Sequence, residues 1–217
     1  MPREYFCKQL LVVEKILGTL VGKNALDVGA GLGMGMKAMA LRGMNVYGIE
    51  ASQSFYRKAI EKMGIPKDRL DCKSIEDADY AENSFDFVNF SAVLEHFYDP
   101  SACVANAMRW LKPGGVLFIE VPSADFLVTT MLNFYVKITG SDYISNISPM
   151  HPPFHLYEFL LKTFEEHSKV NGNLYSIAQS EYVPCTAYMP RWIDKLFIWL
   201  MLRTARGMQL SIYLKKN

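Results

Sequence analysis

The residues in this sequence that are best suited to chemistry form a glycine-rich turn followed by an acidic side chain. The turn, Gly-Ala-Gly-Leu-Gly, runs from Gly29 to Gly33 and follows an apolar stretch that ends at Val28. Glycine lets a ligand approach the backbone N–H groups at the start of a helix closely. Glu50 ends the next apolar stretch, and its carboxylate can accept hydrogen bonds from both hydroxyls of a ribose. These residues predict a site for a cofactor that contains adenosine.

The spacing of the glycines distinguishes two classes of cofactor. A dinucleotide site has the pattern Gly-x-Gly-x-x-Gly, which places a pyrophosphate at the N-terminus of a helix. Here Met34 occupies the position of the third glycine, because the glycines alternate from Gly29 to Gly35. A nicotinamide-dependent oxidoreductase is therefore disfavoured. The simpler alternative is a tight strand-to-helix turn in which the glycines serve packing alone.

The sequence contains four histidines, and two of them are candidate general bases. His151 and His155 lie on either side of Pro152 and Pro153, and a helix is predicted to start close to His155. Imidazole is the side chain best suited to accept a proton near neutral pH. We therefore predict His155 and His151 as catalytic residues, with packing or capping of the helix start as the alternative for His155. His167, in a polar helical stretch, is expected to face solvent.

Short apolar stretches alternate with helical patterns along most of the chain. Strands separated by helices imply right-handed crossovers and a mostly parallel sheet covered on both faces, so the predicted fold is a doubly wound α/β fold. The segment Lys112–Gly115 is predicted to break the chain before a strand, and residues 123–150 are expected to be irregular. The predicted strands cover residues 24–28, 45–49, 85–90, 116–121, 174–178 and 208–214, and the predicted helices cover residues 36–42, 54–62, 102–111, 151–170 and 192–202.

The composition is that of an ordinary globular protein. The chain has 217 residues, of which 50% are hydrophobic, and a formal net charge of +1. This length suits a single domain over residues 1–217, and the charge balance argues against a disordered chain and against a nucleic-acid partner. The four widely spaced cysteines indicate reduced thiols. The first apolar stretch, Leu10 to Val13, is too short for the core of a signal peptide, so a cytoplasmic protein is expected.

Two insertions are predicted to follow a cofactor-binding core at residues 23–122. Residues 123–160 and 179–207 would build the substrate side of the pocket. The second insertion carries the apolar helix Trp192–Leu202, in a region whose charged residues are mostly basic. A helix that is apolar nearly all round is buried or contacts something apolar. Three interpretations stay open: a core helix, a homodimer contact, and contact with an apolar ligand or, peripherally, with a membrane surface.

Five segments between residues 23 and 122 resemble class I S-adenosylmethionine-dependent methyltransferases in order and spacing. Leu26–Gly33 looks like motif I of that family, and Glu50 matches its acidic ribose ligand. Ser84–Val88 resembles the fourth strand, Val93–Pro100 the helix after it, and Leu111–Leu117 the turn before the fifth strand. The resemblance is to the small-molecule enzymes, similar to the ubiquinone and menaquinone pathway group. It implies S-adenosylmethionine as cofactor and S-adenosylhomocysteine as product.

The resemblance also implies cofactor contacts position by position. The glycine turn would line the methionine and ribose portion, Asp27 would orient the amino group, and Glu50 would hold the ribose hydroxyls. Ser74 and Ile75 fall where relatives contact adenine, although many relatives have Asp at the position of Ser74. The implied cofactor-binding residues are Asp27, Gly29, Ala30, Gly31, Gly33, Glu50, Ala51, Ser74, Ile75 and, at the methionine end, Ser91.

The segment Leu94-Glu95-His96 raises the question of a metal. Ubiquinone-pathway O-methyltransferases have a similar segment, in which an earlier glutamate joins the Glu-His pair to hold a divalent metal. Ala92 stands at that earlier position here, so the triad is incomplete. We therefore expect no metal, and predict that His96 packs or lines a pocket.

The resemblance implies methyl transfer to a small-molecule acceptor. A sulfonium methyl is already activated, so transfer needs proximity, in-line alignment and, for a hydroxyl acceptor, removal of a proton. The apolar insertions favour the hydroxyl oxygen of a hydrophobic, aromatic or sugar- or lipid-linked metabolite. The alternatives are a cofactor-binding module without turnover and a protein methyltransferase. Nucleic-acid amine methylases are disfavoured, because Phe90–Val93 lacks their Asn/Asp-Pro-Pro-aromatic turn.

Overall fold

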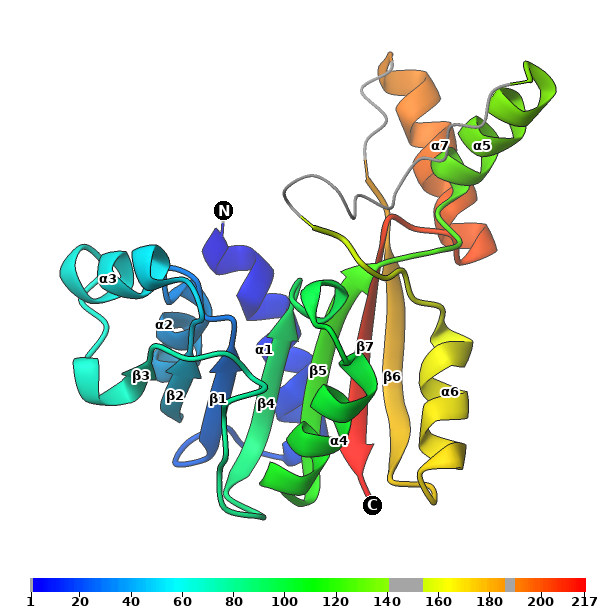
Figure 1. Cartoon of the computed structure of the whole chain (residues 1–217). Helices are drawn as coiled ribbons and strands as arrows, with labels where there is room; N and C mark the ends of the chain where they lie inside the picture. The colour runs from blue at the N-terminus through cyan, green and yellow to red at the C-terminus, as the bar shows by residue number, and fades with distance from the viewer. Residues whose placement is uncertain (1, 141–153, 186–189) are drawn as a thin grey trace.

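A computed structural model describes residues 2–140, 154–185 and 190–217 and shows a seven-stranded sheet with helices on both faces (Figure 1). The strand order is β3-β2-β1-β4-β5-β7-β6. The first five strands in this order are parallel, and β7 runs antiparallel to β5 and β6. The predicted doubly wound α/β fold is confirmed. The strands are β1 (Asn24–Val28), β2 (Asn45–Ile49), β3 (Leu70–Asp71), β4 (Phe85–Ser91), β5 (Leu111–Pro122), β6 (Tyr175–Val183) and β7 (Gln209–Lys216).

Two hydrophobic cores lie on opposite faces of this sheet. Successive side chains of a strand point to opposite faces, so Leu117 belongs to one core and Phe118 to the other. The first core is completed by α4 (Pro100–Trp110) and α6 (Leu161–Val170). The second core is completed by α1 (Pro2–Leu17), α2 (Met34–Leu41) and α3 (Gln53–Glu61). Both faces of the central strands are therefore apolar, as their continuous apolar sequences require.

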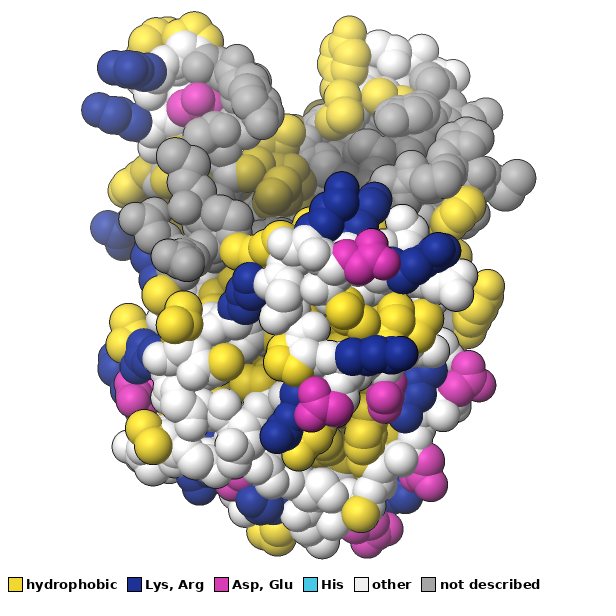
Figure 2. Space-filling view, turned by 90° about the vertical axis from the view of Figure 1, so that its left-hand side faces the viewer, with side chains coloured by type: hydrophobic (Ala, Val, Ile, Leu, Met, Phe, Trp, Pro, Cys, Tyr) yellow, Lys and Arg dark blue, Asp and Glu magenta, His cyan; other side chains and the backbone are white. Residues whose placement is uncertain are grey.

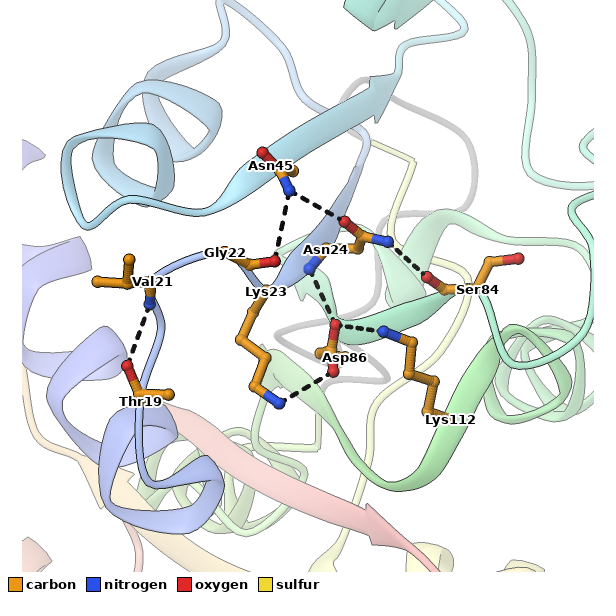
Figure 3. Close-up of polar contacts among 9 residues, drawn as sticks. All are labelled: Thr19, Val21, Gly22, Lys23, Asn24, Asn45, Ser84, Asp86 and Lys112. Atoms are coloured by element: carbon orange, nitrogen blue, oxygen red, sulfur yellow. Dashed lines mark hydrogen bonds and ion pairs between the residues drawn. The ribbon is translucent and has the colours of Figure 1, made fainter.

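A buried carboxylate fixes the amino ends of the central strands (Figure 3). Asp86 of β4 accepts hydrogen bonds from the backbone N–H of Asn24 at 2.9 Å, from Lys112 at 2.8 Å and from Lys23 at 3.3 Å. Burial alone would raise the pKa of Asp86, but these hydrogen bonds hold it below its usual value. The start of β1 is thereby tied to β4 and β5, which sets the register that carries β1 into the glycine turn.

Two helices occur where the sequence analysis predicts none. Residues 2–17, for which the sequence predicts no element, form α1, and its Leu10 and Val13 are buried against the sheet. Residues 123–150 were expected to be irregular, but α5 (Leu127–Ile138) lies within them. None of the side chains of α5 is buried, and its apolar pattern therefore does not mark a core position.

The helix predicted over residues 151–170 is wrong in its first part. Residues 151–153 lie outside the described residues, and the helix α6 starts only at Leu161. Leu160 has extended backbone angles, with φ −109° and ψ 155°. The backbone before it is bonded elsewhere: Leu156 N donates to Glu95 O at 2.9 Å, and Ala124 N donates to Phe159 O at 3.1 Å. These tertiary hydrogen bonds outweigh the local helical pattern.

The strand boundaries also extend beyond the prediction. The segment Lys112–Gly115 does not end the pairing but bulges out of β5, since Leu111 pairs with Phe85 and Val116 with Phe87. Residues 179–183, predicted as part of an insertion, continue β6 instead.

The helix predicted at residues 192–202 is confirmed as α7 (Arg191–Thr204), but it is not a core helix. Only Met201 is buried, whereas Trp192 is 71% exposed and Trp199 is 53% exposed. Together with α5, α7 extends beyond the edge of the sheet where the parallel strands end (Figure 1). None of the helices in the described part of the chain has the length and apolar character that crossing a membrane requires.

Candidate active site

The glycine turn lies where the strand order of the sheet reverses direction. Strand β1 is followed by β2 on one side and has β4 on the other, and the turn after β1 opens at the carboxyl end of the strands. In open α/β sheets this is the position at which ligands bind. Gly29, Gly31 and Gly33 all have positive φ, at 69°, 57° and 78°. The turn conformation therefore explains why three glycines alternate here.

The three glycines face different surroundings. A Cβ on Gly29 would overlap the side chain of Val93, and a Cβ on Gly33 would lie 2.5 Å from Ile65. A side chain at either position would therefore disturb the packing around the turn, and contact of Gly29 and Gly33 with a cofactor stays a prediction. A Cβ on Gly31 would approach nothing closer than the carbonyl oxygen of Gly29, at 4.0 Å. Gly31 is accordingly the position at which the turn is open to a ligand.

Glu50 is bound to the glycine turn itself. Its Oε2 accepts from Gly31 N and its Oε1 from Ser52 N, both at 2.7 Å, and the residue is 8% exposed. Each carboxylate oxygen has a second lone pair that these bonds leave available for a ribose hydroxyl. Ala51, beside it, is exposed. The acceptor oxygens of Glu50 and the open backbone at Gly31 fit an adenosine cofactor.

The side chain of Asp27 is held by groups of β4 and α2. It is buried, accepts a hydrogen bond from Asn89 Nδ2 at 2.6 Å, and is also bonded to the backbone of Met36. Burial raises the pKa of Asp27 to about 6, from an ordinary value of 3.8. The contact with the cofactor amino group expected for Asp27 stays a prediction, since these bonds direct its carboxylate toward β4 and α2.

The three residues expected to contact the adenine or methionine portion of the cofactor lie in different surroundings. Ile75 is buried in the core, so only its backbone is available to adenine. The hydroxyl of Ser74 donates to Asp77 at 2.9 Å and shapes the turn before it. Ser91 ends β4 opposite Glu120, at the carboxyl edge of the sheet. The next residue, Ala92, has a positive φ of 53°, a conformation that is uncommon outside glycine and occurs often at functional sites.

The loop after β4 connects the glycine turn to the predicted base. Val93 packs on Gly29, and the short 3₁₀ helix η2 (Leu94–His96) follows at once. The ring Nδ1 of His96 lies 2.9 Å from the carbonyl oxygen of Phe154. This pairing, with the bond from Leu156 to Glu95, holds the segment around His155 beside η2. Residues 58 and 61 positions apart in the sequence are thus brought to one edge of the sheet.

Three groups meet at this edge. The ring centroids of His96 and His155 are 5.1 Å apart, and ligand atoms of Glu95, His96 and His155 all lie within 4.8 Å of one another. Glu95 is 2% exposed, and its Oε2 has no hydrogen-bond partner within the described residues. Burial raises the pKa of Glu95 and lowers that of His155, which the charge of His96 lowers further. His151, the second predicted base, lies outside the described residues.

These three groups offer two chemistries. A carboxylate and two imidazoles form a donor set that suits a divalent metal such as zinc. They also form an acid–base cluster in which His155, with its low pKa, is neutral and able to accept a proton near pH 7. Sequence reasoning separated Glu95 and His96 from His155, because only the fold brings the segment at 154–156 onto η2.

The other described histidine does not face solvent as expected. His167 is half-buried in α6, and its two ring nitrogens lie 3.0 Å from the hydroxyls of Tyr175 and Ser101. Its helical face packs on the sheet, which the polar neighbours in the sequence did not indicate. A cavity of about 370 Å³ between α2, β2 and η1 (Lys67–Arg69) contains none of the predicted site residues.

Comparisons with known proteins agree with this geometry. Residues 26–119 match the family described as methyltransferase domain. The chain is 32% identical over 135 residues to a ubiquinone biosynthesis O-methyltransferase of Coxiella burnetii, covering 60% of this chain and 55% of the relative. It is 32% identical over 151 residues to the enzyme of the same name from Chromobacterium violaceum, covering 68% of this chain and 62% of the relative. The chain thus spans just over half the length of these curated relatives.

Solved structures show the same fold. A SAM-dependent methyltransferase from Archaeoglobus fulgidus superposes with a TM-score of 0.65 at 15% identity, covering 100% of this chain and 95% of that one. An S-adenosylmethionine-dependent methyltransferase from Mesorhizobium loti gives 0.67 at 14% identity, with 95% and 96% covered. The matched segment holds the glycine turn, Glu50 and the loop after β4. Residues 26–119 of this chain thus match a methyltransferase domain, and the chain has the fold of S-adenosylmethionine-dependent methyltransferases.

Proposed function

We propose that this protein transfers a methyl group from S-adenosylmethionine to a hydroxyl oxygen of a small hydrophobic acceptor, aromatic or sugar- or lipid-linked, with His155 as general base. The observation that carries the proposal is the packing of the loop after β4 between the glycine turn and His155. The names of the ubiquinone O-methyltransferase relatives support an oxygen acceptor. The exposed apolar side chains that follow β5 and β6 support an apolar one.

The proposed chemistry asks little of the protein beyond positioning and one proton transfer. The cofactor supplies a methyl group already activated on a sulfonium sulfur. Glu50 and the open face at Gly31 would hold its ribose, and His155 would take the proton of the attacking hydroxyl. The Glu95 carboxylate, within 4.8 Å, would stabilise the positive charge that His155 gains.

Cofactor binding is tested by calorimetric titration with S-adenosylmethionine, S-adenosylhomocysteine and NAD. We expect the first two to bind with micromolar affinity and NAD not to bind. Glu50→Gln removes the charge that holds the ribose, so we expect about a tenfold or greater loss of affinity. Glu61→Gln, an exposed glutamate on α3, is the matched control and should change nothing. Failure of both sulfur nucleotides to bind the folded protein would refute the proposed function.

The general base is tested by single-turnover methyl transfer. His155→Ala should slow transfer by about a hundredfold or more while cofactor affinity stays the same, because the base acts on the acceptor. His167→Ala, which removes a histidine of α6 that is not part of the cluster of Glu95, His96 and His155, is the control. Equal losses in rate and cofactor affinity would contradict a base role. Cofactor binding without transfer to any acceptor would instead indicate a module without turnover.

Chelation distinguishes a metal centre from a general base. A base mechanism predicts that dialysis against EDTA leaves the rate unchanged. If activity disappears and returns with added Zn²⁺ or Mg²⁺, and if both His96→Ala and His155→Ala abolish metal retention, then the three-residue cluster is a metal centre rather than a base.

A further inference from the structure

Helices α5 and α7 form a projection and are joined by hydrogen bonds at their common base. Leu127 N, at the start of α5, donates to the carbonyl oxygen of Arg206, just after α7, at 3.1 Å. The Arg206 side chain donates in turn to Asp125 O at 3.1 Å and to Thr130 Oγ1 at 3.4 Å. Met201 of α7 is fully buried beside this junction. The two helices are therefore held to the sheet domain at one end and extend from it at the other (Figure 1).

The free part of α7 exposes an apolar stripe. Trp192, Leu196 and Trp199 are 71%, 48% and 53% exposed, and they recur at the spacing that places residues on one face of a helix. Leu202, 58% exposed, borders the same stripe one turn further on. Tryptophan is costly to leave in water, so a stripe with two of them requires a partner.

The free part of α5 exposes a second stripe of the same kind. Met131, Phe134, Tyr135 and Ile138 are 51%, 67%, 64% and 68% exposed. Their positions, i, i+3, i+4 and i+7, lie on one face of the helix. Figure 2 shows two lobes at the end of the molecule from which α5 and α7 project. Both lobes carry hydrophobic side chains, and one of them also carries basic side chains.

The charges around the two stripes are mostly positive. Within α5 and α7 there are four basic residues and one acidic residue, Asp194, which gives +4 − 1 = +3 in a chain whose total is +1. Arg203 lies over the ring of Trp199, with 5.7 Å between its guanidinium carbon and the ring centroid. Long basic side chains beside exposed aromatic rings can reach phosphate groups while the rings enter the acyl region. The basic residues are Lys137, Arg191, Lys195 and Arg203.

We propose that α5 and α7 bind this protein to the surface of an anionic lipid bilayer. The helices have 12 and 14 residues, too few for the roughly 20 that span a bilayer, so they would lie at its surface. A second copy of the chain would bring two faces of charge +3 together, whereas an anionic surface complements that charge. The occupant that fits both the apolar stripes and the charge is therefore a bilayer rather than a dimer partner.

The projection lies at the same edge of the sheet as the candidate active site, so binding to a bilayer would bring that site close to the membrane. Both helices leave the sheet at the edge that carries the glycine turn and His155, because α5 follows β5 and α7 joins β6 to β7 there. An apolar acceptor dissolved in the bilayer would reach that edge without crossing water. This last point rests on the proposed methyl transfer, whereas the binding of the bilayer does not.

Vesicle flotation of the full chain tests the proposal. We expect binding to phosphatidylcholine vesicles that contain phosphatidylglycerol, about tenfold weaker binding at high salt, and little binding to phosphatidylcholine alone. Trp192→Ser with Trp199→Ser should lower binding tenfold or more, and Lys195→Glu with Arg203→Glu should do the same. Leu41→Ser with Val170→Ser, which removes equally exposed apolar side chains elsewhere, should leave binding unchanged.

The three tryptophans provide a second measurement. Trp110 is fully buried in the sheet domain, whereas Trp192 and Trp199 are exposed. Brominated lipids should therefore quench the fluorescence of the wild-type chain but not that of Trp192→Phe with Trp199→Phe, which retains Trp110. No flotation with anionic vesicles, or flotation that the tryptophan and charge variants do not reduce, would overturn the proposal. Since cofactor titration is independent of lipid, failure of either proposal is distinguishable from failure of the other.

Discussion

At the scale of single residues, two carboxyl groups inside the sheet domain are shifted strongly toward their neutral form. Burial raises the pKa of Asp27 to about 6 and that of Glu120 to about 7. Glu120 is 3% exposed, and among the described residues its carboxylate accepts hydrogen bonds from two neutral groups, Gln9 Nε2 and the Ser211 hydroxyl, both at 3.3 Å. Neutral partners offset only part of the cost of burying a carboxylate.

The pKa of Glu120 sets a pH dependence of stability. The folded protein binds this proton more tightly than the unfolded chain, whose glutamate has an ordinary pKa of 4.5. The free energy of unfolding therefore falls as the pH rises from about 4.5 to about 7, by up to roughly 3 kcal/mol from this group. Glu120→Gln should remove that fall, so that urea unfolding shows a more stable protein at pH 8 and little change at pH 4.5. Glu61→Gln should leave the profile as it is, and a Glu120→Gln profile parallel to the wild type would refute the assignment.

The lowered pKa of His155 makes a separate prediction about rate. Because its neutral form is the base, methyl transfer should rise with pH to a plateau and lose activity only below the ordinary histidine pKa of 6.5. This acid limb should vanish in His155→Ala and persist in His167→Ala. An acid limb centred well above pH 6.5 would place the titrating group elsewhere.

The sequence predicts the local part of the site better than the long-range part. Gly29 to Gly33 and Glu50 are recognisable because a turn and the end of the neighbouring strand have fixed spacing along the chain. Glu95 and His155 are 60 positions apart, and nothing in their immediate neighbours shows that Phe154 bonds to His96. The left-handed backbone of Ala92 is equally hidden, since alanine carries no signal for positive φ.

At the scale of elements, helix α2 depends on one glycine that the motif did not single out. Gly35 lies in the first turn of α2, and a Cβ there would lie 2.6 Å from Asp27 Oδ2 and 3.3 Å from Phe6. Helix propensity favours alanine over glycine by about 1 kcal/mol, whereas overlap in a packed interior costs about 1–3 kcal/mol. Because Asp27 is buried and hydrogen-bonded, the cost of its overlap with a Cβ at position 35 should exceed the gain in helix propensity.

Gly35→Ala is therefore expected to destabilise the protein by about 1–2 kcal/mol rather than stabilise it. The measurement is urea unfolding of the four members of a double-mutant cycle with Asp27→Ala. In the Asp27→Ala background the overlap is gone, so Gly35→Ala should become neutral or stabilising. An additive cycle would show that the Asp27 contact does not limit this position.

At the scale of the whole molecule, the parallel half of the sheet follows from the sequence, whereas for β6 and β7 the sequence predicts the strands but not their order or antiparallel pairing. The strands β1, β4 and the second half of β5 are nearly continuous buried stretches connected through helices, which is the pattern of buried parallel strands, whereas β2 begins with alternating exposed and buried residues. In the projection of α5 and α7, by contrast, the sequence pattern does not indicate the degree of burial that the structure shows. Apolar residues at helical spacing normally indicate burial, yet here the described helices leave them exposed.

The position of β7 between β5 and β6 also has a consequence for how the nascent chain folds. Strand β6 is synthesised before β7, but within the described sheet its one neighbour is β7, so it cannot join the sheet until β7 has been made. During that interval its backbone N–H and C=O groups are open to pairing with another chain, which is the usual route to aggregation. The polar run Gln179-Ser180-Glu181 in the middle of β6 is suited to this delay, because a charged, hydrophilic strand is a poor template for association while it waits.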